Sequence, residues 1–162
     1  MEIRRTNPSD EDEICRLYIE SWKAGYRGLL PQKFLDELSG DRWKGREFLR
    51  DEGSFVITES GKILGHVHIR PAEDSKMQGW GEVHTMYVLP GFWGKGYGSE
   101  LFRYALNRLK EQGFSRVYLW VLQGNERAMG FYAKHGFRET SDTLECEVGG
   151  ALVTDIRFIK EQ

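Results

Sequence analysis

A glycine-rich stretch in the second half of the chain has the composition of an anion-binding turn. Residues 89–99 read Leu-Pro-Gly-Phe-Trp-Gly-Lys-Gly-Tyr-Gly-Ser and join an apolar segment to a predicted helix. Glycine lets successive backbone N–H groups point into one concavity, and the start of a helix adds the positive end of its dipole. The stretch therefore predicts a phosphate-binding turn, although a plain glycine-rich turn has the same composition.

Two common phosphate-binding motifs do not fit this turn. The Walker motif requires Gly-Lys-Ser/Thr after its last glycine, but Gly96 is followed by Tyr97. The dinucleotide fingerprint would have Ser99 in place of its third glycine, and the apolar segment 117–122 is followed by Gln123 instead of a ribose-binding acid. We therefore do not expect a nucleotide-binding regulator.

The turn instead resembles the Gln/Arg-x-x-Gly-x-Gly/Ala loop of the GNAT N-acetyltransferases, and segment 82–99 is similar to that family's central strand, loop and helix. Residues 125–137 read Asn-Glu-Arg-Ala-Met-Gly-Phe-Tyr-Ala-Lys-His-Gly-Phe and are similar to the family's second cofactor motif, Asn-x-x-Ala-x-x-Phe-Tyr-x-x-x-Gly-Phe. Segments 3–5 and 21–31 are similar to bacterial members. The resemblance implies one GNAT domain over residues 1–162, an α/β (α+β) fold whose mixed, twisted sheet has splayed central strands flanked by helices.

The resemblance also implies acetyl-coenzyme A as co-substrate and direct transfer of its acetyl group to a primary amine in a ternary complex. The residues expected to bind the cofactor are Met86, Tyr87, Val88, Trp93, Gly94, Lys95, Gly96, Tyr97, Gly98, Ser99, Asn125 and Tyr132. Trp93 departs from the family pattern, which usually has Gln or Arg at that position. Because backbone N–H groups form most of the cradle, we expect the grip on the diphosphate to be kept.

The attacking amine must lose a proton, because an amine with a pKa of about 10.4 is only about one part in 10³ neutral at pH 7. Glu82 stands where the resemblance puts a catalytic carboxylate and is the first candidate base, although it could be an ordinary strand-end glutamate. Strand alternation predicts that Glu82, His84, Met86 and Val88 share one face. His84 is then the second candidate base, since a free imidazole has a pKa of about 6.5.

Other side chains have a catalytic and a structural interpretation. Tyr132 is similar in position to the tyrosine that protonates the leaving thiolate in many family members, but beside Phe131 it could equally be a core aromatic. Trp22, Tyr26 and Trp80 could line the acceptor pocket or pack in the core.

Metal and thiol chemistry are not expected. His66 and His68 share a strand face and could form a three-histidine metal site with His84, but the family needs no metal. Cys15 and Cys146 are in no Cys-x-x-Cys arrangement, and we expect reduced thiols and no acyl-cysteine intermediate.

Apolar periodicity and turn residues predict the elements that position these groups. Helices are expected after the capping residues 7–10, and over 31–38, 41–50, 98–112 and 126–135. Strands are expected over 2–6, 55–57, 63–69, 82–89, 117–122, 143–148 and 152–159.

The composition describes an ordinary globular chain: 162 residues are 40% hydrophobic and 30% charged, with a formal net charge of −2. This charge does not favour nucleic acid or an anionic membrane surface as partner, and we expect a cytoplasmic protein. A small-molecule amine is the expected partner, and a homodimer is allowed. The alternatives are a catalytically silent acyl-CoA sensor and a protein N-terminal or lysine acetyltransferase.

Overall fold

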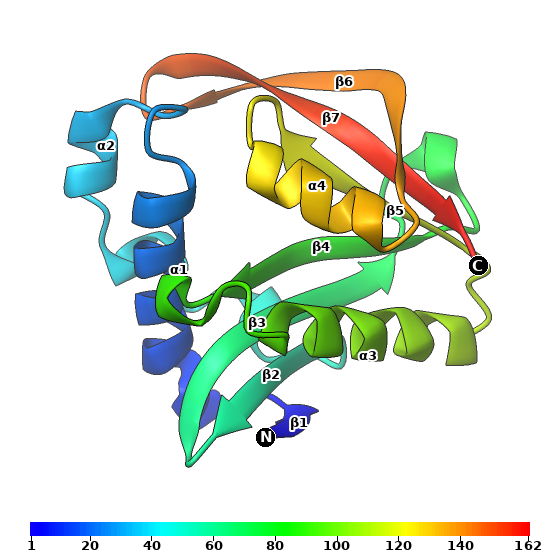
Figure 1. Ribbon diagram of the computed structural model, residues 1–162, viewed down its shortest axis with the longest axis horizontal. Helices are drawn as coiled ribbons and strands as arrows, with labels where there is room; N and C mark the ends of the chain where they lie inside the picture. The colour runs from blue at the N-terminus through cyan, green and yellow to red at the C-terminus, as the bar shows by residue number, and fades with distance from the viewer.

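A seven-stranded mixed sheet forms the middle of the molecule in this computed structural model, which describes residues 1–162 (Figure 1). The strand order is β1-β2-β3-β4-β5-β7-β6, and β4 and β5 are the one parallel pair. The strands are β1 (Glu2–Arg5), β2 (Ser54–Glu59), β3 (Lys62–Pro71), β4 (Gly81–Val88), β5 (Arg116–Leu122), β6 (Arg138–Val148) and β7 (Ala151–Glu161). The helices are α1 (Glu11–Gly25), α2 (Gln32–Asp36), α3 (Tyr97–Glu111) and α4 (Glu126–Lys134).

The helices α1 and α3 cover opposite faces of the sheet. The His66 side chain on β3 bonds to Tyr18 of α1, with 2.7 Å between Nδ1 and the hydroxyl. A Cβ atom at the preceding Gly65 would lie 3.2 Å from Leu101 of α3. Since successive strand residues point to opposite faces, these two contacts define an α1 face and an α3 face. The predicted fold class is therefore confirmed.

The predicted helix over 41–50 is wrong. Two 3-10 turns, η2 (Gly40–Arg42) and η3 (Glu47–Leu49), occupy this segment. Gly45 has a φ of 79°, which a right-handed helix does not allow. Trp43 and Leu49 are buried on either side of this glycine, so the segment is held by packing and not by a helical hydrogen-bond ladder.

The parallel strands β4 and β5 separate soon after they pair. Only Gly81 with Val117 and Glu82 with Tyr118 are in register, so the rest of β4 has no partner on its β5 side. The amide direction on this free edge follows from strand alternation. Because the Leu89 N–H donates to Leu64 on β3, the N–H groups of Val88 and Met86 point away from β3, into the gap.

A β-bulge interrupts β4 just before the gap. Thr85 pairs with His68, and Val83 pairs with Ile69, so His84 is an extra residue without an opposite partner. The His84 ring turns to the α1 face, where its Nδ1 lies 3.0 Å from Nδ1 of His68.

The prediction that Glu82, His84, Met86 and Val88 share one face is therefore wrong. Glu82 lies opposite Arg70 on the α1 face, and the bulge turns His84 to the same side. Met86 and Val88 follow the bulge and lie on the α3 face, where a Cβ on α3 at position 98 would meet Val88. One inserted residue reverses the alternation of everything after it.

The last two strands form a long hairpin whose tip reaches α2 (Figure 1). The Gly149-Gly150 turn closes it, with φ values of 60° and 83°. A Cβ at Gly149 would collide with Phe34 of α2, so only glycine fits this contact. Both cysteines are free thiols, and none of the helices has the length and apolar character needed to cross a bilayer.

Candidate active site

A cavity of about 580 Å³ passes through the sheet where β4 and β5 separate. One end lies beside the start of α3 and the glycine turn, and the other lies beside the end of α1. Its walls come from β4 (83–88), the glycine turn and the start of α3 (92–94, 96, 98 and 99), β5 (119–122), α4 with its cap (125, 127, 128, 130–132 and 134) and α1 with its end (21, 25 and 26). The gap in the sheet thus connects its two faces.

The glycine turn presents unpaired backbone donors to this cavity. The Glu100 N–H is the first of α3 to bond within the helix, to Gly96 C=O at 3.0 Å, and the N–H groups of Gly94 to Ser99 have no backbone partner. Gly94 and Gly96 have φ values of 72° and 92°, which bend the chain so that these groups converge. Free amides at the positive end of a 15-residue helix form an anion site.

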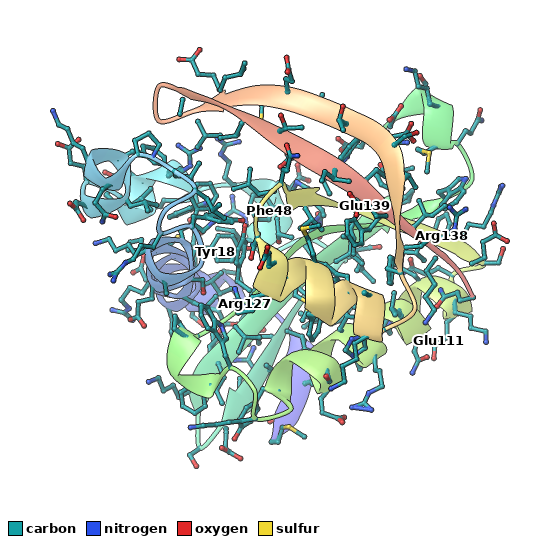
Figure 2. The ribbon with its side chains drawn as sticks, turned by 45° about the horizontal axis from the view of Figure 1, so that its top comes forward. Tyr18, Phe48, Glu111, Arg127, Arg138 and Glu139 are labelled. Atoms are coloured by element: carbon teal, nitrogen blue, oxygen red, sulfur yellow. The ribbon has the colours of Figure 1, made fainter.

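Trp93 is tied to the cavity wall by its indole. The Nε1–H donates to Val88 C=O at 2.8 Å, and the ring lies 3.5 Å below the guanidinium of Arg127 from α4. Arg127 lines the cavity, is exposed to solvent and reaches Gly25 on α1 (Figure 2). Its charge has no carboxylate partner, and partial desolvation by the surrounding protein lowers its pKa. The guanidinium is therefore free to pair with an anion bound at the turn.

The first turn of α4 contributes two of the expected cofactor residues. Asn125 caps the helix, since its Oδ1 accepts from the Ala128 N–H at 3.3 Å, and the residue lines the cavity. Tyr132 also lines the cavity, and its ring packs 5.3 Å from that of Phe102 on α3. Burial raises the pKa of Tyr132 well above its usual value, so the phenol keeps its proton at neutral pH.

Aromatic residues form the α1 end of the cavity. The hydroxyls of Tyr26 and Tyr87 are 3.0 Å apart, and both residues line the cavity. Trp22 lies behind Tyr26, with ring centroids 5.1 Å apart, and does not line it. Trp80 lies outside the cavity, where Arg116 stacks over its ring. Of the three expected acceptor residues, only Tyr26 faces the cavity.

Glu82 lies in a second, smaller pocket of about 310 Å³ on the α1 face. Its carboxylate is only 4% exposed and bonds to Arg70 Nε at 2.9 Å. Tyr118 and Arg157 also line this pocket, and Trp120 is a wall of both pockets. Trp120 therefore lies between Glu82 and the main cavity, and Glu82 is held in an ion pair with Arg70.

His84 lines the main cavity and is the first of three groups joined by hydrogen bonds. Its Nδ1 lies 3.0 Å from His68 Nδ1, and His68 Nε2 lies 2.8 Å and 3.0 Å from the two oxygens of Asp51. Burial lowers the pKa of His84 to about 3 and lowers that of His68. Both rings are therefore neutral at neutral pH.

His66 belongs to a different group, so the three histidines do not converge on one point. Its ring bonds to the Tyr18 and Ser54 hydroxyls, each at 2.7 Å. The structure contains no cluster of His, Cys, Asp or Glu arranged to hold a metal ion.

Comparison with known proteins decides the family, because residues 12–137 match the Acetyltransferase (GNAT) family. The chain belongs to the GNAT acetyltransferases. It is 33% identical over 141 residues to an uncharacterized N-acetyltransferase of Archaeoglobus fulgidus, covering 85% of this chain and 93% of the relative. It is 23% identical over 142 residues to the spermidine N(1)-acetyltransferase of Thermoplasma acidophilum, covering 85% and 88%. Among solved structures, the PaiA N-acetyltransferase of T. acidophilum in complex with coenzyme A has the same fold, with a TM-score of 0.80 and 19% identity over 99% of this chain and 98% of that chain.

This GNAT protein is an N-acetyltransferase, and most of the residues expected from its two motifs meet at one cavity. Two expected cofactor residues do not line it: Lys95 lies over the Phe92 ring, and the Tyr97 hydroxyl bonds to Glu59. The lining members of that expected set are Met86, Tyr87, Val88, Trp93, Gly94, Gly96, Gly98, Ser99, Asn125 and Tyr132.

Sequence reasoning missed two residues around this GNAT cavity, Arg127 and Asp51. Arg127 stands at a variable position of the second motif, and only its place next to the helix cap could have drawn attention to it. Asp51 comes from outside both motifs, and no spacing in the sequence connects it to His84. His68 was considered beside His84 only as a possible metal ligand, and the structure joins the two rings by a hydrogen bond instead.

Proposed function

We propose that this N-acetyltransferase moves the acetyl group of acetyl-coenzyme A to the primary amine of a small molecule, by direct attack within a ternary complex. The observation that carries the proposal is the cavity that passes through the sheet, with free amides at one end and aromatic side chains at the other. A cofactor entering from the α3 face and an amine entering from the α1 face would meet at the gap between β4 and β5.

The cofactor grip follows from the free donors. The N–H groups of Gly94 to Ser99 are available for the diphosphate, and Arg127 adds a solvent-exposed positive charge at the rim. Apart from the Val88 C=O, which accepts from Trp93 Nε1 and Ser21 Oγ, the edge of β4 without a strand partner can bond the amides of the pantetheine arm as a neighbouring strand would. The coenzyme A complex of the structurally similar PaiA enzyme supports this assignment of the cofactor.

Besides the cofactor and the amine, the reaction needs three protein groups: a donor to the negative oxygen, an acid for the leaving thiolate and a base for the amine proton. The amine nitrogen attacks the thioester carbonyl, a C–N bond forms, and the N–H of Met86 or Val88 stabilises the negative oxygen because both point into the gap. The C–S bond then breaks, the Tyr132 hydroxyl protonates the departing thiolate, and the phenolate left behind takes a proton from water when the products leave. No covalent enzyme intermediate is required, since Cys15 and Cys146 lie outside the cavity.

The base that receives the proton of the amine was expected to be Glu82 or His84. We propose His84, because it lines the cavity, whereas Glu82 is committed to Arg70 in the adjoining pocket. Proton transfer by a positioned side chain contributes about 10²–10⁴-fold to a rate. Substitution of Glu82 by Gln should therefore cost less activity than substitution of His84 by Gln.

The decisive experiment measures release of coenzyme A thiol from acetyl-CoA across a panel of acceptors. The panel contains polyamines, because one relative is a spermidine acetyltransferase, together with amino acids, aminoglycosides and peptides with a free N-terminus or lysine. Acceptor-dependent release with a small amine supports the proposal. Release with peptides alone would identify a protein acetyltransferase, and binding of acetyl-CoA without any release would identify a silent sensor.

A further inference from the structure

A chain of hydrogen bonds leads from the cavity wall to the surface of the molecule. It starts at His84 on the bulge of β4, continues through His68 on β3 and ends at Asp51 in the turn after η3. The side chain of His68 is 3% exposed, and that of Asp51 is 32% exposed. A buried imidazole thus connects a cavity residue to a carboxylate in contact with solvent.

The hydrogen-bonding capacity of each group fixes where the protons are. The Asp51 carboxylate only accepts, so His68 Nε2 carries a proton and donates to it. A neutral imidazole has one N–H, and His68 Nδ1 must therefore accept. The donor to it is Nδ1 of His84, 3.0 Å away. The proton of His84 is thereby held on Nδ1, and its Nε2 keeps a lone pair.

The lone pair on Nε2 is not used within the protein, and His84 lines the cavity. Nε2 of His84 has no hydrogen-bond partner in the protein, and the atom is accessible to solvent. Phe48 holds the two rings in place, since its ring meets His84 edge-on at 5.1 Å and His68 at 5.7 Å between ring centroids. The neighbouring charges are Arg70 on β3, Glu82 on β4 and Asp51 itself.

We propose that Asp51 and His68 are positioning residues that lock His84 in the Nδ1–H tautomer, so that Nε2 of His84 faces the cavity as the proton acceptor. The inference rests on the proposed function and adds two residues to its mechanism. As the amine attacks, its proton moves to Nε2, and the imidazolium keeps its Nδ1–H bond to His68. The same Nε2 gives the proton to water when the products leave, and the chain returns to its starting state.

The carboxylate at the end of the chain has a second effect. An imidazolium at His84 is stabilised through neutral His68 by the negative charge of Asp51, in the manner of an aspartate behind a catalytic histidine. If His68 itself becomes protonated, its Nδ1 becomes a donor, and Nδ1 of His84 can then only accept. Because burial keeps the pKa of His68 below its usual 6.5, the lock holds through neutral pH and opens in acid.

An isosteric change at the far end of the chain tests the lock. Asp51→Asn keeps an oxygen for the Gly53 N–H, which bonds to Oδ1 at 2.8 Å, and puts an NH₂ donor at the place of Oδ2. His68 Nε2 lies 2.8 Å from that donor and 3.0 Å from the retained oxygen, so we expect the nearer donor to reverse the bonds of the chain and to leave the proton of His84 on Nε2. The matched control is Glu52→Gln, which removes the exposed neighbouring carboxylate outside the chain.

Two measurements distinguish the tautomer of His84 from the acetylation activity. Nitrogen-15 shifts of the histidine rings report the tautomer directly: we expect Nδ1–H at His84 in the wild type and in Glu52→Gln, and Nε2–H in Asp51→Asn. In the acetylation assay, Asp51→Asn should lower kcat about 10²-fold with the KM for acetyl-CoA unchanged, and raising the pH should recover part of the rate because the amine then loses its proton unaided. Imidazole added to His84→Ala should restore part of the activity.

Several outcomes would overturn the inference. An Nε2–H tautomer at His84 in the wild type would do so, whatever the activity. So would an Asp51→Asn variant that melts like the wild type and keeps kcat within about twofold. If the wild type acetylates no acceptor, the proposed function fails, but the ring shifts still decide whether the lock exists.

Discussion

Replacing Arg127 by methionine should weaken the binding of acetyl-CoA while leaving the chemistry at the thioester intact. The guanidinium lies 3.5 Å over the Trp93 ring at the rim of the cavity, and it has no carboxylate partner there. Methionine keeps the apolar stem that covers Trp93 and removes the charge. The change therefore tests the role of the charge with little loss of packing.

The size of the effect follows from the exposure of Arg127 to solvent. An ion pair between exposed groups contributes about 0.2–1 kcal/mol, and a hydrogen bond to a charged group contributes about 1.5–3 kcal/mol. At about 1.4 kcal/mol for each factor of ten, removal of the guanidinium should raise the Kd for acetyl-CoA by about 5- to 12-fold, between the upper end of the first range and the lower end of the second. Part of this effect should disappear at high salt, because the rim is open to solvent.

Calorimetry with two ligands provides the assay. Acetyl-CoA carries the diphosphate, whereas acetyl-pantetheine carries the same thioester without it. Arg127→Met should weaken the first and leave the second within about twofold. Arg103→Met is the matched control, because Arg103 lies on the exposed side of α3 and pairs with Glu100. Equal losses for both ligands would mean that Arg127 acts by packing alone, and no loss for either would remove it from the cofactor site.

Other changes have equally definite expected outcomes. Tyr132→Phe should lower kcat about 10²-fold with little change in the KM for acetyl-CoA, and full turnover in a steady-state assay would remove its role as acid. Gly65→Ala should destabilise the fold by about 1–3 kcal/mol in urea, because the added Cβ would lie 3.0 Å from Ile57 and 3.2 Å from Leu101; unchanged stability would show that these side chains yield. Burial lowers the pKa of His66 to about 3, so the unfolded chain binds its proton first and stability should fall as the pH drops from 6.5 towards 3. In His66→Gln this dependence, measured by urea unfolding at several pH values, should be weaker; an identical slope would assign it to other groups.

Local features of the chain were enough to identify the family and half of the site. The glycine turn, the helix that follows it and the position of Tyr132 all depend on residues close together in sequence, since turn and helix geometry connect neighbours a few positions apart. The free amides of Gly94 to Ser99 follow from that same local geometry. The strands were also placed within a few residues, because their alternation is local.

The faces of β4 depended on its partner strand. The bulge at His84 is a property of the pairing between β3 and β4, and the β4 sequence alone alternates as if no residue were inserted. The helix expected over 41–50 failed for a similar reason, because Gly45 turns the chain so that buried side chains on either side reach the core. Packing outweighed the local preference in both places.

What the amino-acid sequence determined by itself was the cofactor turn, the order of the elements and the reaction class. Only the tertiary structure decided which polar groups meet. Asp51, His68 and His84 stand on three different segments, and Arg127 meets Trp93 from a separate helix. The physical reason is that a hydrogen bond or a stacked cation depends on distance in space, and folding brings together residues whose separation along the chain has no period to reveal them.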